Sequence, residues 1–556
     1  MAEVDGSAHR SPEGRTPLGV TLAELAGRLP DRPAITHEGV TRTYRELEER
    51  TNRLARAYRE LGVGQDSFVT IGLPNGIEFF EAVLATYKLG ATPQPVSWRL
   101  PAAEHSAIIE LADPALLVGA GDGGVGGAGR PAVPAGFTPD PALSRAPLPP
   151  RAASSWKAVT SGGSTGRPKL IVSTAPAVFE GLATLAALFR MRRDGVQLVA
   201  GPLYHNAPFL TGVVGLLTGN HQVVMTRFDA EGCLALVDRH RVEWTHVVPT
   251  MMHRIWRLPE DVRRAYDLSS LRTLFHGAAP CPVWLKEAWI DWLGPDRVWE
   301  IYAATEGQAG TVITGGEWLE HRGSVGRVAV GEIRVLDPGG AELPAGRTGA
   351  IWMRRGEDAP PEYRYIGAEA TARDGNWESL GDVGHFDADG YLYITDRETD
   401  MVLVGGRNVY PAEVESALEE HPLVASSCVV GIPDDDLGNV LHAIVQIDGT
   451  ASDEELLAHL RERLVTYKLP RSFERVTEPL RGDDGKVRRS ALRSARISTA
   501  SREASMQDDT ESRVRAAIEA HGLKPAPEEM AMYVAMAPVL QAMTEQLHAV
   551  EVGEDV

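Results

Sequence analysis

One stretch decides how the sequence is interpreted, Thr160-Ser-Gly-Gly-Ser-Thr-Gly-Arg-Pro-Lys169. Its three glycines let backbone N–H groups approach an anion closely, its four hydroxyls add donors, and Lys169 adds a positive charge. The Walker pattern is not met, because Leu170 stands where that pattern needs Ser or Thr. The alternative is a Gly- and Ser-rich surface turn, but the combination favours a phosphate-binding loop.

The residues before this loop alternate between helical and β-type patterns. Helices are expected over 44–58 and 77–89, with a β-rich run at 67–72 between them. This alternation predicts an α/β fold with layered sheets and helices. The Gly- and Pro-rich stretch 119–155 is interpreted as a mobile surface insertion in a large domain spanning 16–396.

A second, smaller α+β pattern is expected over residues 401–497. It contains a predicted helix and two predicted strands, at 411–420, 425–431 and 441–447. Residues 498–556 predict a Met-rich helical extension that covers the body of the protein or meets a partner or a second copy. The polar residues 1–15 are expected to be disordered.

Composition limits the possible partners and compartment. The 556 residues carry a net charge of −20, which argues against nucleic acid or a membrane as the main partner. Three cysteines without a CxxC pair fit a reducing compartment rather than a disulfide or zinc framework. The N-terminus has no apolar signal region, and Pro538 interrupts the longest apolar stretch. A cytoplasmic protein is expected.

The loop resembles the signature of the adenylate-forming superfamily, which includes acyl-CoA synthetases, peptide-synthetase adenylation domains and luciferases. Further matching motifs follow in the family's order: Tyr302-Ala-Ala-Thr-Glu306, Trp377-Glu-Ser-Leu-Gly-Asp382, Asp396-Arg-Glu-Thr-Asp400 and Asp484-Gly-Lys486. The resemblance implies a large N-terminal domain, a hinge at 397–400 and a small mobile C-terminal domain. It implies ATP (or a supplied acyl-AMP), Mg²⁺ and CoA as cofactors, and a small carboxylic acid as substrate.

The family reaction joins a carboxylate to the α-phosphate of ATP, and a thiol then displaces AMP. The resemblance assigns the β- and γ-phosphates to the loop residues Ser161, Gly162, Gly163, Ser164, Thr165, Gly166 and Lys169. It assigns the α-phosphate to Thr305 and Mg²⁺ to Glu306, a hard oxygen ligand. A solvated surface glutamate is the alternative for Glu306.

The nucleoside is assigned to a second group of residues. Tyr302 would stack on adenine, with a core tyrosine as the alternative, and Asp382 would accept the ribose hydroxyls. Arg397 would reach the ribose or a phosphate. The small residues Gly277, Ala278 and Ala279 would leave room for the base.

The catalytic assignments concern the acid and the thiol. Lys486, in a glycine-containing loop, would carry its ammonium to the carboxylate and the α-phosphate, unless it is an ordinary exposed lysine. Gly405 and Gly406 would let a pantetheine arm pass. His205 would gate the acyl pocket or orient the carboxylate, with a structural loop histidine as the alternative.

Short stretches of the sequence suggest the type of acyl group. The stretches PLYHNAPF and HGAAPCP are similar to those of steroid- and bile-acid-type CoA ligases, which suggests a bulky polycyclic or aliphatic acid, such as a terpenoid acid of an actinobacterial natural-product pathway. Gly212, Gly215 and Gly307 are expected to make the pocket roomy. The basic residues Arg488, Arg489 and Arg493 are candidates for the CoA phosphates.

Alternatives to a complete acyl-CoA ligase stay open. Thr399 departs from the Asp or Lys usual at the family's hinge, and Ala303 replaces a glycine, so a ligase that only forms thioesters from supplied acyl-AMP is one alternative. An enzyme that loads a carrier protein is another. A non-catalytic scaffold is a third, which the retained charged residues disfavour.

Overall fold

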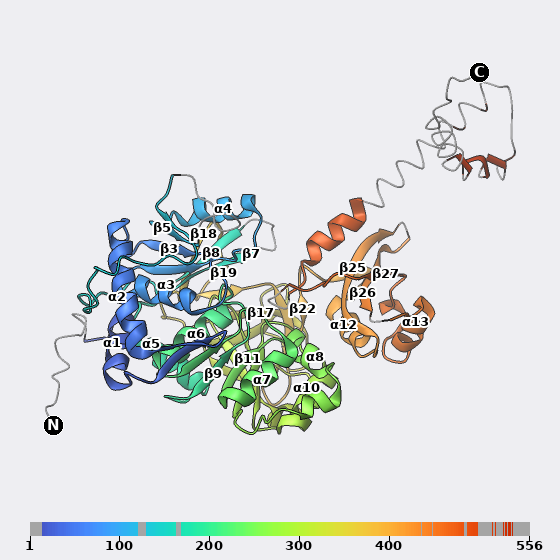
Figure 1. Ribbon diagram of the computed structural model, residues 1–556. Helices are drawn as coiled ribbons and strands as arrows, with labels where there is room; N and C mark the ends of the chain where they lie inside the picture. The colour runs from blue at the N-terminus through green and yellow to red at the C-terminus, as the bar shows by residue number, and fades with distance from the viewer. Residues whose placement is uncertain are drawn as a thin grey trace, which may run out of the picture.

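The computed structural model describes residues 14–119, 129–162, 168–434, 436–447, 449–482 and 486–498, with ten further positions between 514 and 537. Figure 1 shows a large domain, from α1 to β22, and a small domain, from β23 onward. Most of the predicted disordered N-terminus and helical extension lies outside the described residues. Among the described residues, no helix has both the length and the apolar composition needed to cross a membrane.

A nine-stranded sheet forms the centre of the large domain. Its six neighbouring inner strands, from β13 to β1, run parallel, and antiparallel strands close both edges. In spatial order the strands are β15 (Arg327–Val330), β14 (Gly310–Thr314), β13 (Val298–Ala303), β12 (Thr273–Gly277), β11 (Trp244–Val247), β9 (Val196–Val199), β10 (His221–Val224), β1 (Pro33–His37) and β2 (Val40–Thr43).

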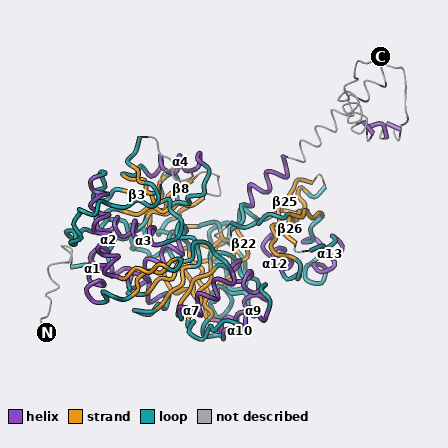
Figure 2. The backbone as a smooth tube through the Cα atoms, in the orientation of Figure 1, coloured by secondary structure: helices purple, strands orange, loops and turns teal. Residues whose placement is uncertain are grey.

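Helices flank the sheets of the large domain, as Figures 1 and 2 show. In chain order they are α1 (Leu18–Arg28), α2 (Tyr44–Glu60), α3 (Ile77–Lys88), α4 (Ala102–Ala112), α5 (Phe179–Leu188), α6 (Asn206–Leu217), α7 (Ala230–His240), α8 (Pro249–Trp256), α9 (Glu260–Arg264), α10 (Val283–Leu293) and α11 (Gly315–Glu320). The predicted α/β class is therefore confirmed, and the helices predicted at 44–58 and 77–89 correspond to α2 and α3.

Three smaller sheets complete the large domain. The four-stranded parallel sheet holds β4 (Thr92–Pro95), β3 (Phe68–Ile71), β5 (Leu116–Val118) and β6 (Ala132–Val133). The three-stranded antiparallel sheet holds β18 (Tyr363–Ile366), β8 (Pro168–Ser173) and β7 (Ala158–Gly162). The six-stranded sheet holds β19 (Thr371–Arg373), β20 (Trp377–Ser379), β17 (Gly349–Arg354), β21 (Asp382–Phe386), β22 (Leu392–Arg397) and β16 (Glu332–Leu336).

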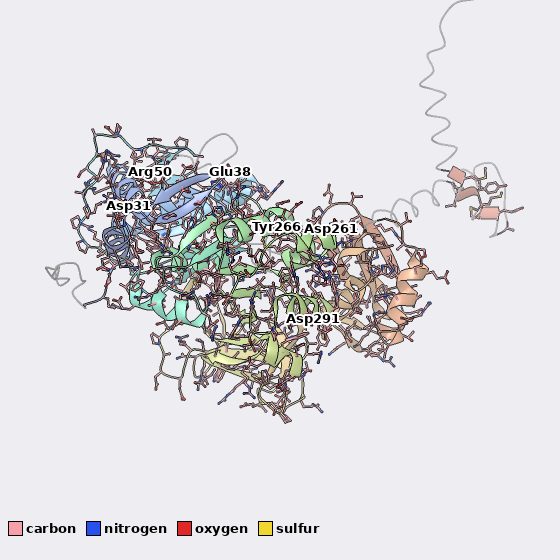
Figure 3. All side chains as sticks on the ribbon, turned by 60° about the horizontal axis from the view of Figure 1, so that its bottom comes forward. Asp31, Glu38, Arg50, Asp261, Tyr266 and Asp291 are labelled. Carbon is pink, nitrogen blue, oxygen red and sulfur yellow. The ribbon has the colours of Figure 1, made fainter. Side chains whose placement is uncertain are left out.

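The sequence of α2 shows why these helices form and pack. Thr43 and Glu46 form a reciprocal capping box at its N-terminus. Leu54 is buried one turn before Tyr58 on the same face. Each large apolar side chain buried in this way contributes about 2 kcal/mol. Arg50, labelled in Figure 3, donates from α2 to Glu81 of α3 at 2.6 Å.

The mobility expected for 119–155 stays a prediction, and the contacts of the part described from residue 129 onward argue against it. This part has little regular structure, but its backbone is bound to the helices beneath it. The Gly136 N–H donates to Glu78 at 2.7 Å, and Asn52 donates to the Arg145 carbonyl at 2.8 Å. Side chains of α2 and α3 thus supply partners that glycine and proline content alone does not predict.

The small domain has a three-stranded sheet, a hairpin and flanking helices. Its elements are β23 (Val402–Val404), β24 (Arg407–Val409), α12 (Pro411–Glu419), β25 (Val424–Asp434), β26 (Gly438–Ile447), α13 (Asp453–Arg461) and β27 (Ser472–Val476). A further helix covers residues 489–498. The helix and strands predicted at 411–420, 425–431 and 441–447 are confirmed by α12, β25 and β26.

Candidate nucleotide-binding site and hinge

The predicted phosphate loop connects two antiparallel strands. Ser161 and Gly162 end β7, and their backbones pair with Lys169 and Pro168 at the start of β8. The assigned residues Gly163, Ser164, Thr165 and Gly166 lie outside the described residues. The hairpin therefore presents the loop at the ends of two paired strands.

Lys169 and Glu306 lie together although 137 positions separate them in the sequence. The Lys169 Nζ is 3.6 Å from Oε1 of Glu306, and the glutamate is buried. Tyr365, which the sequence did not indicate, donates its hydroxyl to the same Oε1 at 2.5 Å. Burial and this hydrogen bond raise the pKa of Tyr365, so the phenol stays protonated and donates. Thr305 precedes Glu306 in the turn after β13.

A second cluster joins Tyr302, Asp382 and Arg397. The Tyr302 hydroxyl donates to Oδ2 of Asp382 at 2.7 Å, and the Arg397 Nε lies 3.3 Å from Oδ1. Burial, and then the nearby Asp382 carboxylate, raise the pKa of Tyr302. The backbones of Asp382 and Arg397 pair between β21 and β22, which fixes the two charges opposite each other.

Gly277 ends β12, and Ala278 and Ala279 follow in a bend. A Cβ at Gly277 would lie 2.6 Å from the carbonyl oxygen of Ile301, so this position requires glycine. Ala278 has a φ of +67°, in the left-handed region that residues with a Cβ seldom adopt. Strained backbone of this kind clusters at ligand-binding sites.

His205 occupies the N-cap position of α6 without a side-chain capping hydrogen bond, and its ring centre lies 4.6 Å from that of Tyr204. The next residue, Asn206, accepts a hydrogen bond from the Nζ of Lys157, a buried lysine that the sequence did not indicate. Burial lowers the pKa of Lys157 to about 8, against a smaller opposing effect of Glu306. A buried cation therefore lies between the predicted phosphate and acyl regions.

The expected roominess conferred by Gly212 and Gly215 is wrong. Both glycines are buried in α6, where a Cβ at Gly215 would lie 1.8 Å from Oε1 of Gln197 and one at Gly212 would lie 3.1 Å from Phe80. They allow close packing of the helix rather than space for a ligand. Gly307 has open space around it and a φ of +76°.

The remaining predicted residues belong to the small domain. Gly405 and Gly406 form the turn between β23 and β24, with φ values of +54° and +78° that suit the primed turns of two-residue hairpins. Lys486 is exposed, in a loop closed by pairing of Arg481 with Val487. These residues lie in the small domain, whereas the clusters around Glu306 and Asp382 lie in the large domain (Figure 1).

The hinge region contains a buried ion cluster that contradicts the proposed CoA role of Arg489. Its Nε lies 3.1 Å from Asp400, and its other nitrogens bind Glu415 and the Val429 carbonyl. Arg493 donates to the Gly431 carbonyl at 2.7 Å. The charge count near Lys486 did not reveal these partners, because they lie far away in the sequence.

Two family models match the chain. One, described as AMP-binding enzyme, matches residues 22–358, and one described as the AMP-binding enzyme C-terminal domain matches residues 413–482.

Individual relatives cover most of the chain. A feruloyl-CoA synthase of an Amycolatopsis species is 35% identical over 476 residues, which are 82% of this chain and 94% of that protein. A Mycobacterium tuberculosis protein named 3-[(3aS,4S,7aS)-7a-methyl-1,5-dioxo-octahydro-1H-inden-4-yl]propanoyl:CoA ligase is 32% identical over 510 residues, 85% of this chain and 97% of that protein. The solved o-succinylbenzoate CoA synthetase from Bacillus subtilis, in complex with its acyl-adenylate intermediate, has a TM-score of 0.73 and 26% identity, covering 85% and 97% of the two chains.

Proposed function

Because the chain belongs to the family of AMP-binding enzymes, we propose that it activates a bulky hydrophobic carboxylic acid as an acyl-adenylate and transfers the acyl group to CoA. The resemblance to adenylate-forming acyl-CoA ligases is confirmed, and the chain is an acid–thiol ligase that uses ATP, Mg²⁺ and CoA. The observation that best supports the proposal is the meeting of Lys169 with Glu306, beside the cluster of Tyr302, Asp382 and Arg397.

The residues near the loop fit a magnesium nucleotide. Glu306 offers a buried carboxylate, and both of its described contacts fall on Oε1, which leaves Oε2 for a hard cation. A magnesium ion held there would neutralise charge on the phosphates. Lys169 would leave Glu306 for a phosphate oxygen, where a compact ammonium offsets negative charge. Asp382 would hold the ribose and so fix the position of the α-phosphate.

The small domain would supply the changing part of the site. We propose that Lys486 places its ammonium between the acid carboxylate and the α-phosphate during adenylation. Rotation about residues 397–400 would then replace it with the Gly405–Gly406 turn, which lacks side chains that could obstruct a pantetheine arm. We propose that residues 16–396 form the large domain and residues 401–497 the small domain that rotates.

The type of acid is inferred from the relatives. Two relatives carry names that specify a feruloyl group and a fused-ring propanoyl group. We infer a cyclic, largely apolar acid, with His205 near its carboxylate. We place the reaction in the cytoplasm because ATP and CoA are available there, and the three cysteines are free. The described tail residues Met532, Tyr533 and Met536 are exposed, which supports a docking role for the extension.

A panel of acids tests this proposal. Aromatic, fused-ring and long aliphatic acids are each assayed with ATP, Mg²⁺ and CoA, and pyrophosphate and thioester are measured separately. We expect both products in equal amounts from a cyclic acid. Thioester only from supplied acyl-AMP would reveal a ligase limited to the second step, and preference for a holo-carrier protein over CoA would reveal a loading enzyme. Absence of both products with every acid would refute the proposal.

A further inference from the structure

Tyr365 contacts both charged residues of the presumed phosphate site. It lies on β18, which pairs with β8, the strand that carries Lys169. Its hydroxyl donates to Oε1 of Glu306 at 2.5 Å, and the Nζ of Lys169 lies 3.9 Å from the centre of its ring. The three groups form a closed triangle, because the ammonium is also 3.6 Å from Oε1.

The phenol and the ring perform separate physical tasks. The hydroxyl fixes the rotation of the Glu306 carboxylate by occupying one oxygen, so that the other oxygen keeps one direction. The ring attracts the ammonium of Lys169 through its negative face. The neighbouring Tyr363 donates its hydroxyl to Glu378 at 2.7 Å, and its ring packs edge-on against that of Tyr365, with the ring centres 4.8 Å apart.

We propose that Tyr365 is a positioning residue for the magnesium nucleotide, orienting Glu306 through its hydroxyl and holding Lys169 through its ring. This inference rests on the proposed function, since it takes Glu306 as the metal ligand and Lys169 as the phosphate ligand. Without nucleotide, Lys169 and Glu306 neutralise each other. When the nucleotide arrives, the ion pair separates and the hydroxyl still keeps Glu306 in place.

The first test uses Tyr365→Phe, with Tyr266→Phe as the matched control, because Tyr266 also donates its hydroxyl to a carboxylate, that of Glu231, at 2.8 Å. Binding of Mn²⁺ in the presence of ATP is measured by the loss of the free-ion paramagnetic resonance signal, with no acid added. We expect Tyr365→Phe to weaken Mn²⁺ binding about 10-fold, the scale set by outer partners of metal ligands. Tyr266→Phe should stay within about twofold of the original protein. Equal binding by all three proteins would overturn the role of the hydroxyl.

The second test separates the ring from the hydroxyl. Tyr365→Leu removes both, so metal-free ATP should bind more weakly to it than to Tyr365→Phe, by about threefold for one exposed cation–π contact. Equal binding of metal-free ATP by the two variants would overturn the role of the ring. Circular dichroism establishes the folded fraction of each variant, and affinities are expressed per folded molecule.

Failure of this inference is distinguishable from failure of the proposed function. Both tests read nucleotide and metal binding, and neither needs a correct acid or CoA. A protein that binds Mn²⁺ and ATP in a Tyr365-dependent way but releases no pyrophosphate with any acid would keep the inference and lose the proposed function. Normal ligase activity with unchanged Mn²⁺ binding in Tyr365→Phe would do the reverse.

Discussion

Two ion clusters of this molecule use the same kinds of side chain in opposite ways. At Glu306 a carboxylate meets one lysine at 3.6 Å and one phenol. At Arg489 a guanidinium meets two carboxylates and a carbonyl, with its nitrogens engaged from several directions. Fork-shaped guanidinium contacts of this kind fix geometry, whereas an ammonium at longer range can exchange partners.

The difference indicates which cluster is built to change. The Glu306 cluster can release Lys169 to a phosphate without leaving its carboxylate unbound, because Tyr365 remains. Loss of Arg489 from its cluster would leave the buried Glu415 without the cation that pairs with it. We therefore assign exchange with ligand to the first cluster and structural integrity of the small domain to the second.

The largest expected effect comes from breaking the Arg489 cluster. Arg489→Met should destabilise the small domain by about 3–5 kcal/mol, because Glu415 stays buried without its cation. Chemical denaturation followed by fluorescence measures the loss. Arg471→Met is the control, since that arginine pairs with Asp434 at the surface and should cost under about 1 kcal/mol. Equal losses would contradict the comparison.

The next effect is catalytic rather than structural. Glu306→Gln should slow pyrophosphate release about 100-fold, because the neutral amide is a weaker ligand for a hard cation. Its unfolding midpoint should remain near that of the original protein. Glu342→Gln, which removes an exposed charge 3.4 Å from Arg334, should change neither quantity. A large loss of stability with little loss of rate would show that Glu306 is structural.

A smaller effect concerns the buried cation at Lys157. Its folded pKa of about 8 lies below the ordinary value of 10.5, so the charged lysine opposes folding at neutral pH. Lys157→Met should raise the free energy of unfolding by about 1–2 kcal/mol at pH 7, after the loss of the Asn206 bond. The gain should shrink as pH rises from 8 to 10.5. A gain independent of pH would contradict a buried charge.

The smallest effect concerns the hairpin turn. Gly405→Ala should destabilise the small domain by about 1 kcal/mol, because φ is +54° there. Gly27→Ala provides the contrast: it lies in α1 with nothing within 4 Å of a new Cβ, and should stabilise by about 0.5–1 kcal/mol. Thermal unfolding of the two variants measures the difference, and a shift of the same sign in both would contradict it.

The motifs allowed much of the fold to be predicted, and also that several candidate site residues lie together. The sequence pattern located α2, α3 and α12, although α3 is buried on all sides from Phe79 to Lys88 rather than on one face. The resemblance indicated that Tyr302 and Asp382 belong to one nucleoside site, and they prove to be hydrogen-bonded across 80 positions.

Contacts that depend on which strands pair could not be predicted. Nothing local to Tyr365 indicates that β18 lies beside β8, so its contact with Glu306 was missed. Arg489 was a candidate for the CoA phosphates because its carboxylate partners, 74 and 89 positions away, could not be recognised from the sequence. The sequence contains one indication that Lys157 is buried: it directly precedes the apolar residues Ala158 and Val159.

The contacts on either side of the hinge reduce the number of residues whose backbone can rotate between the domains. Arg397 is held in the sheet by Asp382, and the Glu398 N–H donates to the Gly381 carbonyl at 2.7 Å. The Asp400 carboxylate lies 3.1 Å from the Arg489 Nε, and its backbone N–H donates to the Arg397 carbonyl at 3.0 Å. Any rotation must therefore be absorbed by about four backbone torsions around Glu398 and Thr399. Two of these torsions belong to the β-branched Thr399. With so few torsions, the two domains would adopt a few defined relative orientations rather than a continuous range.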